Sequence, residues 1–146
     1  MFSSPPILIV DDIASEAMTL DLLCRSFGIE TVRTASAAEA GAFLARMRPA
    51  AIITDLLMPG ADGLDCLFMI AEHAPTVPVM VVTASERLLL KAAGELGVSY
   101  GLRDVTCVAK PVDVATLRDF VARAGIPFKP PQAGLPEAGL PQGGLH

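Results

Sequence analysis

The sequence has few of the residues on which several classes of function depend. It contains no tryptophan, one tyrosine, two histidines and three cysteines in 146 residues. Basic residues are also outnumbered, because 11 lysines and arginines stand against 16 aspartates and glutamates, for a formal net charge of −5. Proteins that bind nucleic acid without regard to its sequence need basic patches to neutralise phosphates. The charge balance therefore argues against a nucleic-acid partner.

The cysteines and the apolar runs exclude two further classes. Cys24, Cys66 and Cys107 are odd in number and widely spaced, which predicts reduced packing residues rather than a disulfide framework or a metal site. No apolar run approaches the roughly 18 residues of a membrane-spanning helix, so no membrane partner is expected. No basic residue precedes the first short apolar run, unlike in a secretory signal. We therefore expect a cytoplasmic protein.

Apolar residues are abundant, at 52% of the sequence against 18% charged residues, which is typical of a globular domain. Continuous apolar runs predict strands buried on both faces at residues 7–10, 51–54, 77–82 and 105–109, and a weaker run predicts a further strand at residues 30–34. Helical spacing of apolar residues fills the intervals between the strands and follows the last one. Ser36 with Glu39 predicts a capped start for the second helix, and Asp113 for the fifth. The fourth helix is predicted to run from about residue 86 to 96 and to end at Gly97.

The alternation of elements predicts an α/β fold. We expect a doubly wound, five-stranded parallel sheet of order 2-1-3-4-5 between two helical layers, a flavodoxin-like three-layer sandwich. A ligand then binds beyond the carboxyl ends of the first and third strands, where the strand order reverses. Residues 1–125 form this domain. The Pro/Gly-rich residues 126–146 predict a flexible tail, which we favour over a proline-rich docking motif.

Five polar residues follow the ends of predicted strands: Asp11 and Asp12 after the first, Asp55 after the third, Thr83 after the fourth and Lys110 after the fifth. Any one of them is ordinary, but together they surround the predicted ligand site. Carboxylates 4 Å apart repel by about 4 kcal/mol per pair at an effective dielectric near 20. Cations must offset this repulsion. Lys110 supplies one, and an all-oxygen site suits Mg²⁺, or Mn²⁺ in its place. Such a set is equipped for phosphoryl transfer.

The segments ILIVDD, IITDLLMPGADG, VVTAS and VAKP, in this order and each at a strand end, resemble the receiver domain of two-component response regulators. The resemblance covers residues 6–125. It implies that a histidine kinase phosphorylates the protein on an aspartate in the presence of Mg²⁺. The residues it assigns are the acceptor Asp55, the metal ligands Asp11, Asp12, Asp55 and the carbonyl of Leu57, and Thr83 and Lys110 on the phosphoryl oxygens.

The same resemblance implies a single-domain response regulator, a signalling domain that catalyses only its own phosphorylation and dephosphorylation. Its partners are a histidine kinase or phosphotransfer protein and a downstream protein that the sequence does not identify. The fourth helix, fifth strand and fifth helix form a face through which such domains make homodimers. The resemblance further implies a backbone conformation at Gly63 that a side chain would hinder, and it allows a cis bond between Lys110 and Pro111.

The sequence departs from the family pattern at Cys107 and in the stretch between Thr83 and Lys110, which is several residues longer than the common receiver pattern. Cys107 stands where the family usually has Tyr or Phe, three residues before the active-site lysine, which points to signalling through the fourth helix and the loop after it instead. Leu57 and Ser85 flank the place from which water attacks, and neither offers an acid or amide to orient it. We therefore predict a phosphoryl group that persists.

Two alternatives remain open at this point. A haloacid-dehalogenase-like phosphatase also uses an Asp nucleophile with Mg²⁺, Thr and Lys. That family, however, places its nucleophile on the first strand as Asp-x-Asp, whereas the aspartates here are adjacent, Asp11 and Asp12. The other alternative is a receiver-like scaffold that is never phosphorylated, against which the complete set of five site residues argues.

Overall fold

The structure, a computed structural model, describes residues 2, 4–59, 62–84 and 87–129. Strands and helices alternate along them: β1 (Ile7–Val10), α1 (Ala14–Ser26), β2 (Thr31–Thr34), α2 (Ala37–Leu44), β3 (Ala51–Asp55), α3 (Asp62–His73), β4 (Val79–Thr83), α4 (Arg87–Ser99), β5 (Val105–Ala109) and α5 (Val114–Arg123). The strands are parallel and lie in the order β2-β1-β3-β4-β5. The predicted fold class is confirmed.

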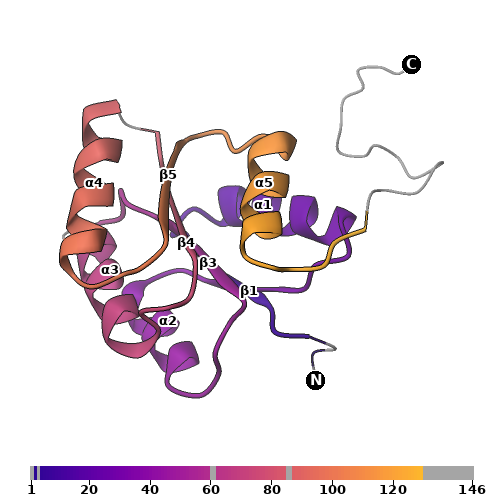
Figure 1. Ribbon diagram of the computed structural model, residues 1–146, viewed down its shortest axis with the longest axis horizontal. Coiled ribbons are helices and arrows are strands. Elements are labelled where there is room, and N and C mark those ends of the chain that lie inside the picture. The colour runs from indigo at the N-terminus through magenta and orange to yellow at the C-terminus, as the bar shows by residue number, and fades with distance from the viewer. Residues whose placement is uncertain (1, 3, 60–61, 85–86, 130–146) are drawn as a thin grey trace.

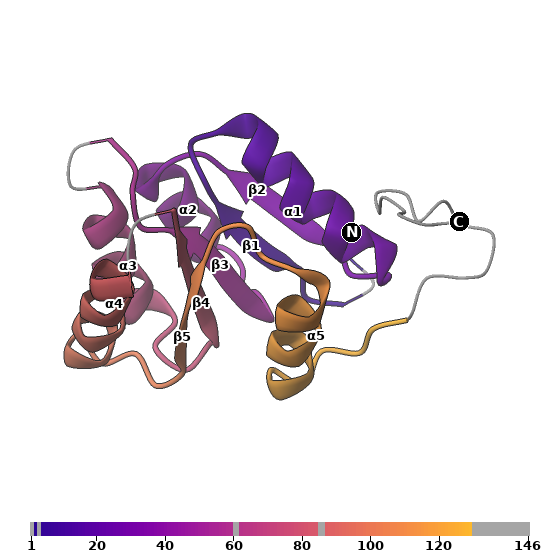
Figure 2. The same ribbon diagram turned by 90° about the horizontal axis from the view of Figure 1, so that it is seen from above.

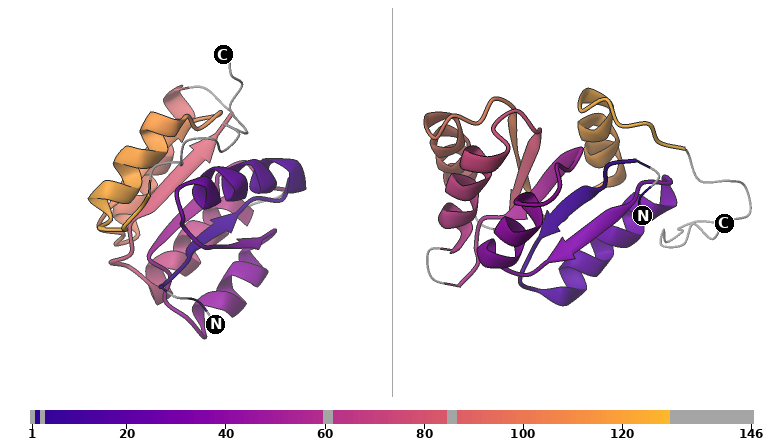
Figure 3. Two further views of the ribbon diagram at one scale, coloured as in Figure 1. Left: turned by 90° about the vertical axis from the view of Figure 1, so that its right-hand side faces the viewer. Right: turned by 90° about the horizontal axis from the view of Figure 1, so that it is seen from below.

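The helices form a layer on each side of the sheet. Helices α1 and α5 cover one face, and α2, α3 and α4 cover the other (Figures 1 and 2). In the left view of Figure 3, α1 and α5 lie in front of the strands. Each layer closes over its own apolar core, and alternate residues of β1 enter opposite cores: Ile7 and Ile9 the α1/α5 core, Leu8 and Val10 the other. All four are fully buried, which explains why the strand is a continuous apolar run.

The cysteines behave as predicted in this packing. All three are free thiols. Cys24 and Cys66 have no exposed surface and belong to the two cores, and Cys107 is partly buried against the second core. Among the described residues, no helix combines the length and the apolar character that crossing a membrane would need.

Two of the predicted helix starts are built as expected. The Ser36 hydroxyl accepts a hydrogen bond from the Glu39 amide at 3.1 Å at the start of α2. The Asp113 carboxylate accepts one from the Thr116 amide at 2.7 Å at the start of α5. In both cases a side-chain oxygen pairs with an amide that the first helical turn leaves without a partner.

The predicted end of the fourth helix is wrong. Helix α4 continues through Gly97 to Ser99, and the backbone takes the left-handed conformation only at Gly101, with φ of +100°. Gly97 has a packing role instead, because a Cβ atom there would lie 3.1 Å from a methyl group of Val105 on β5. The glycine lets α4 lie close to the edge strand.

The folded domain extends past residue 125. Ile126 is 9% exposed and belongs to the α1/α5 core. The ring of Phe128 packs edge to face on Phe27, with 5.7 Å between ring centroids, and the Lys129 amide donates to the Phe27 carbonyl at 2.7 Å. Residues 126–129, which we assigned to the tail, therefore belong to the domain. The rest of the predicted tail, residues 130–146, lies outside the described residues.

Candidate functional site

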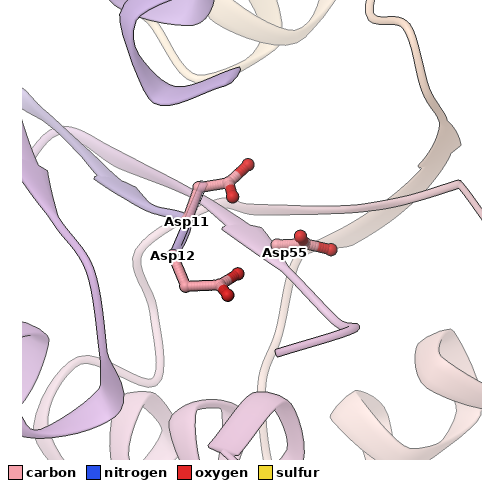
Figure 4. Close-up of side chains that lie close together, drawn as sticks. All are labelled: Asp11, Asp12 and Asp55. Atoms are coloured by element: carbon pink, nitrogen blue, oxygen red, sulfur yellow. The ribbon is translucent and has the colours of Figure 1, made fainter. Parts of the chain in front are cut away.

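The register between β1 and β3 places Asp11 and Asp55 next to each other. Val10 of β1 pairs with Thr54 of β3, so Asp11 and Asp55, each one residue further on, leave the sheet side by side. Parallel strands end at the same edge, and this edge lies where the strand order reverses. The adjacent aspartate Asp12 follows on the same loop. The predicted convergence of the three carboxylates at the switch point is what the structure contains (Figure 4).

The same edge carries Thr83 and Lys110. Asp55 pairs with Val82 of β4, so Thr83 follows one residue beyond it, and Thr83 pairs with Ala109 of β5. The Lys110 amide donates to the Thr83 carbonyl at 2.9 Å, which ties the two strand ends together. The bond between Lys110 and Pro111 is cis. All five predicted polar residues therefore lie along one edge of the sheet.

The three carboxylates form a compact oxygen cluster. One carboxylate oxygen from each of Asp11, Asp12 and Asp55 lies within 4.8 Å of the other two. Asp11 and Asp55 are only 3% and 2% exposed, whereas Asp12 is exposed to solvent. Buried carboxylates this close need cationic partners. An all-oxygen set with one open side fits Mg²⁺, a hard cation that keeps several of its waters.

Backbone amides orient the two buried carboxylates. The Ile13 amide donates to Asp11 Oδ1 at 2.9 Å, and the Leu57 amide donates to Asp55 Oδ1 at 3.0 Å. In both residues the second oxygen, Oδ2, faces the Lys110 ammonium. Leu57 thus reaches the site through its N–H group, and the metal-ligand role of its carbonyl stays a prediction.

Lys110 is the positive centre of the site. Its Nζ lies 3.0 Å from Asp55 Oδ2 and 3.4 Å from Asp11 Oδ2, and it also donates to a carboxylate oxygen of Glu16. Burial lowers the pKa of the ammonium, but the hydrogen bonds from Lys110 to Glu16 and Asp55 outweigh burial and raise it above its ordinary value. The lysine is therefore held fully charged against the carboxylates.

Glu16 is the site residue that sequence reasoning missed. It lies in the first turn of α1, and its side chain is 39% exposed. A usable signal was present, because α1 begins only two residues after Asp12 and its first turn must border the same edge. An acidic residue in the first helical turn is commonly explained by its favourable interaction with the helix dipole. The contact between Glu16 and Lys110 was therefore not recognised from the sequence.

The electrostatics of Asp11 show that the cluster is incompletely neutralised. Burial raises the pKa of this carboxyl above its ordinary value, and the negative charges of Asp55 and Glu16 add to the rise. The Ile13 amide and Lys110 oppose the shift without overcoming it. A cation bound among these oxygens would favour the ionised form.

A side chain at Gly63 would be hindered, as expected, and the cause is a close contact rather than a left-handed backbone. The φ of Gly63 is outside the left-handed region, so no special backbone conformation needs a glycine there. A Cβ atom at position 63 would instead lie 1.8 Å from the Leu56 carbonyl oxygen. The close approach of α3 to the loop after Asp55 excludes any side chain at this position.

Residues 7–122 match the family described as response regulator receiver domain. Protein PilH of Pseudomonas aeruginosa is 29% identical over 113 residues, which cover 76% of this chain and 89% of PilH. Sporulation initiation phosphotransferase F of Bacillus subtilis is 29% identical over 118 residues, covering 80% of this chain and 90% of that protein.

Solved structures agree with these matches. The receiver domain of a sensor histidine kinase from Pseudomonas aeruginosa, crystallised with a magnesium ion coordinated in its active site cleft, has a TM-score of 0.68 and 27% identity. The match covers 84% of this chain and 99% of that domain. The fold and the polar edge of the sheet define a phospho-signalling domain of the α/β class. The chain belongs to the response regulator receiver family, and the comparisons give no support to the phosphatase alternative.

Proposed function

We propose that the protein is a phosphorylation switch in which Asp55 accepts a phosphoryl group from a histidine kinase or a phosphotransfer protein. The proposal rests on the surroundings of the Asp55 carboxylate. Asp55 Oδ1 is fixed by a backbone amide, while Oδ2 lies 3.0 Å from Lys110 Nζ and within reach of a cation among Asp11 and Asp12. A carboxylate held in this way is oriented as a nucleophile toward the open side of the site.

In the reaction, an oxygen of Asp55 forms a bond to the phosphorus of a phosphohistidine as the phosphorus–nitrogen bond breaks. The leaving imidazole nitrogen takes up a proton from water. Lys110 pairs with one oxygen of the transferred group and the Thr83 hydroxyl donates to another. Asp11, Asp12, Asp55 and the Leu57 carbonyl are the proposed ligands of a Mg²⁺ ion, which would neutralise charge on the phosphoryl oxygens.

Phosphorylation adds about −1.5 to −2 charge units and new acceptor oxygens next to Thr83. The conformation that makes more contacts with these oxygens is then favoured, so the switch is a shift of populations. Since Cys107 replaces the usual aromatic, we propose that the signal leaves through α4. The relative that is named a phosphotransferase supports a role in passing the phosphoryl group on to another protein.

We further propose that residues 1–129 form the receiver unit and that its face of α4, β5 and α5 binds a downstream protein or a second copy of the chain. The face is available for docking, because an open groove of about 770 Å³ runs over it between α4 and β5. The protein meets its donor where histidine kinases use ATP, which places it in the cytoplasm. In this account it is a stoichiometric acceptor and has no separate substrate to turn over.

The test is incubation with acetyl phosphate and Mg²⁺ followed by intact mass measurement. The wild type is expected to gain one phosphoryl group, and Asp55→Ala none. Asp65→Ala, at an exposed position of α3, is the matched control and is expected to be labelled like the wild type. A wild type without any mass increase would leave only the scaffold alternative.

A further inference from the structure

Glu16 shares the site lysine with the acceptor aspartate. The Lys110 ammonium donates to Glu16, lies 3.0 Å from Asp55 Oδ2, and is 3.4 Å from Asp11 Oδ2. The Lys110 side chain is 17% exposed and that of Asp55 2%, whereas Glu16 at 39% lies on the solvent side. The lysine therefore bridges from the buried acceptor outward to the first turn of α1.

The position of Glu16 is fixed by the same turn that orients Asp11. The Ile13 amide donates to Asp11 Oδ1 at 2.9 Å, and the Ile13 carbonyl accepts from the Glu16 amide at 3.0 Å. The start of α1 is thus linked to the acidic cluster through Ile13. The Glu16 carboxylate is thereby held beside the Lys110 ammonium at the start of α1.

An ammonium has three N–H donors, and all three have carboxylate partners in this site. A phosphoryl oxygen on Asp55 must take one of these donors from a carboxylate. Glu16, the most exposed of the three partners, is the one whose pairing water can replace most readily. Glu16 therefore competes with the phosphoryl group for Lys110.

We propose that Glu16 is a positioning residue that draws Lys110 partly away from Asp55. In the unphosphorylated protein it leaves the Asp55 and Asp11 oxygens less neutralised, which strengthens binding of a divalent cation. During phosphorylation it opposes the pairing of Lys110 with the incoming anion. The inference rests on the proposed function of Asp55. In this account Glu16 strengthens binding of the divalent cation and weakens binding of the phosphodonor.

The first test measures the contact without metal or phosphate. A double-mutant cycle of Glu16→Gln and Lys110→Met, followed by urea unfolding in EDTA, is expected to show coupling. The loss of stability caused by Glu16→Gln should disappear when Lys110 is absent. The same cycle with Glu72→Gln, an exposed charge on α3, is expected to be additive. Additivity for Glu16 as well would overturn the proposal.

The second test measures Mg²⁺ affinity by calorimetry. Glu16→Gln removes a nearby negative charge and lets Lys110 pair more closely with Asp55, and both effects weaken Mg²⁺ binding. We expect the Kd to rise about three- to tenfold, with no change for Glu72→Gln. Wild-type protein that binds Mg²⁺ no better than Glu16→Gln would overturn the proposal.

The third test separates binding of the phosphodonor from the chemical step. At saturating Mg²⁺, Glu16→Gln is expected to lower the acetyl phosphate concentration for half-maximal rate by about threefold, while the maximal rate stays within about twofold. An unchanged half-maximal concentration contradicts the competition. If the wild type takes up no phosphoryl group, the proposed function fails, and the first two measurements still decide the role of Glu16.

Discussion

Gly94 of α4 faces the thiol of Cys107 on β5, and a Cβ atom at position 94 would lie 3.0 Å from Sγ. Ordinary contacts of this kind are nearly half an ångström longer or more. The absence of a side chain at Gly94 and the small side chain of Cys107 therefore both allow α4 and β5 to pack closely. They bring α4 close to the edge strand at the position where the sequence departs from the family pattern, and α4 is the element through which we propose that the signal leaves.

This relationship predicts a dependence between the two positions. Gly94→Ala should gain about 1 kcal/mol from helix propensity but lose most or all of it to the contact with Sγ. In a Cys107→Ala background the same substitution should stabilise the protein by about 1 kcal/mol. Urea unfolding of the four proteins measures this coupling. An equal effect of Gly94→Ala in both backgrounds would show that the contact does not matter.

A second prediction concerns the loop after the acceptor. Gly63→Ala would force a Cβ atom against the Leu56 carbonyl, so the free energy of unfolding should fall by about 2 kcal/mol or more. Gly41→Ala in α2 is the matched control, because its Cβ would make ordinary contact with Met69 at 3.6 Å and should stabilise the helix slightly. Similar stability of the two variants would refute the steric explanation.

A third prediction follows from Asp21, a buried carboxylate of α1 that is 6% exposed. Burial favours a higher pKa, but hydrogen bonds from Thr31 and Arg25 outweigh it. Together with the charges of Arg25 and Arg33, they lower the pKa below its ordinary value of 3.8. The ionised form therefore stabilises the folded protein above pH 3.8, and this stabilisation is lost as the pH falls through the lower pKa of the folded state.

The test is to substitute Asp21→Asn, which should cost about 1 to 2 kcal/mol at pH 7. The difference from wild type should shrink below pH 3.8, as chemical denaturation at several pH values would show. Asp119→Asn, at an exposed position of α5, should change stability little at any pH. A penalty for Asp21→Asn that stays constant down to pH 2.5 would contradict the assigned ion pairs.

A fourth prediction concerns the lifetime of the phosphorylated protein. Leu57 is 50% exposed beside Asp55 and offers no group to orient water, so we expect slow hydrolysis. Leu57→Gln should accelerate the loss of radiolabelled phosphate about tenfold or more, because an amide can position the attacking water. Leu64→Gln, at a position of α3 that is 39% exposed, is the control. Equal decay in Leu57→Gln and wild type would remove this account of the lifetime, and Ser85, the other flanking residue, lies outside the described residues.

The sequence was sufficient to predict the sheet because its three inner strands, β1, β3 and β4, are buried along their whole length. A run such as Ile7–Val10 has no polar position, and only a parallel sheet between two layers accommodates that pattern. The site was equally predictable in outline, since parallel strands of known order place Asp11, Asp55, Thr83 and Lys110 along one edge. These inferences depend on periodicity, which is a local property of the sequence, and on sheet topology, which follows from a few rules.

Distances between elements could not be predicted in this way. A glycine such as Gly97 is typical of a helix end, yet here it allows α4 to lie close to Val105. Only the packed structure distinguishes the two roles. Glu16 is an ordinary first-turn acid until the position of Lys110 is known. The core packing of Ile126 and Phe128 escaped notice because proline and glycine surround them and weaken any periodic signal.

The most direct test of the central claim locates the phosphoryl group itself. Protein treated with acetyl phosphate and Mg²⁺ is reduced with borohydride, which converts an aspartyl phosphate to homoserine, and its peptides are sequenced by mass spectrometry. The account predicts homoserine at position 55 in phosphodonor-treated protein and at no position in the untreated control. Homoserine at Asp11 or Asp12, or none at all in treated wild-type protein, would contradict it.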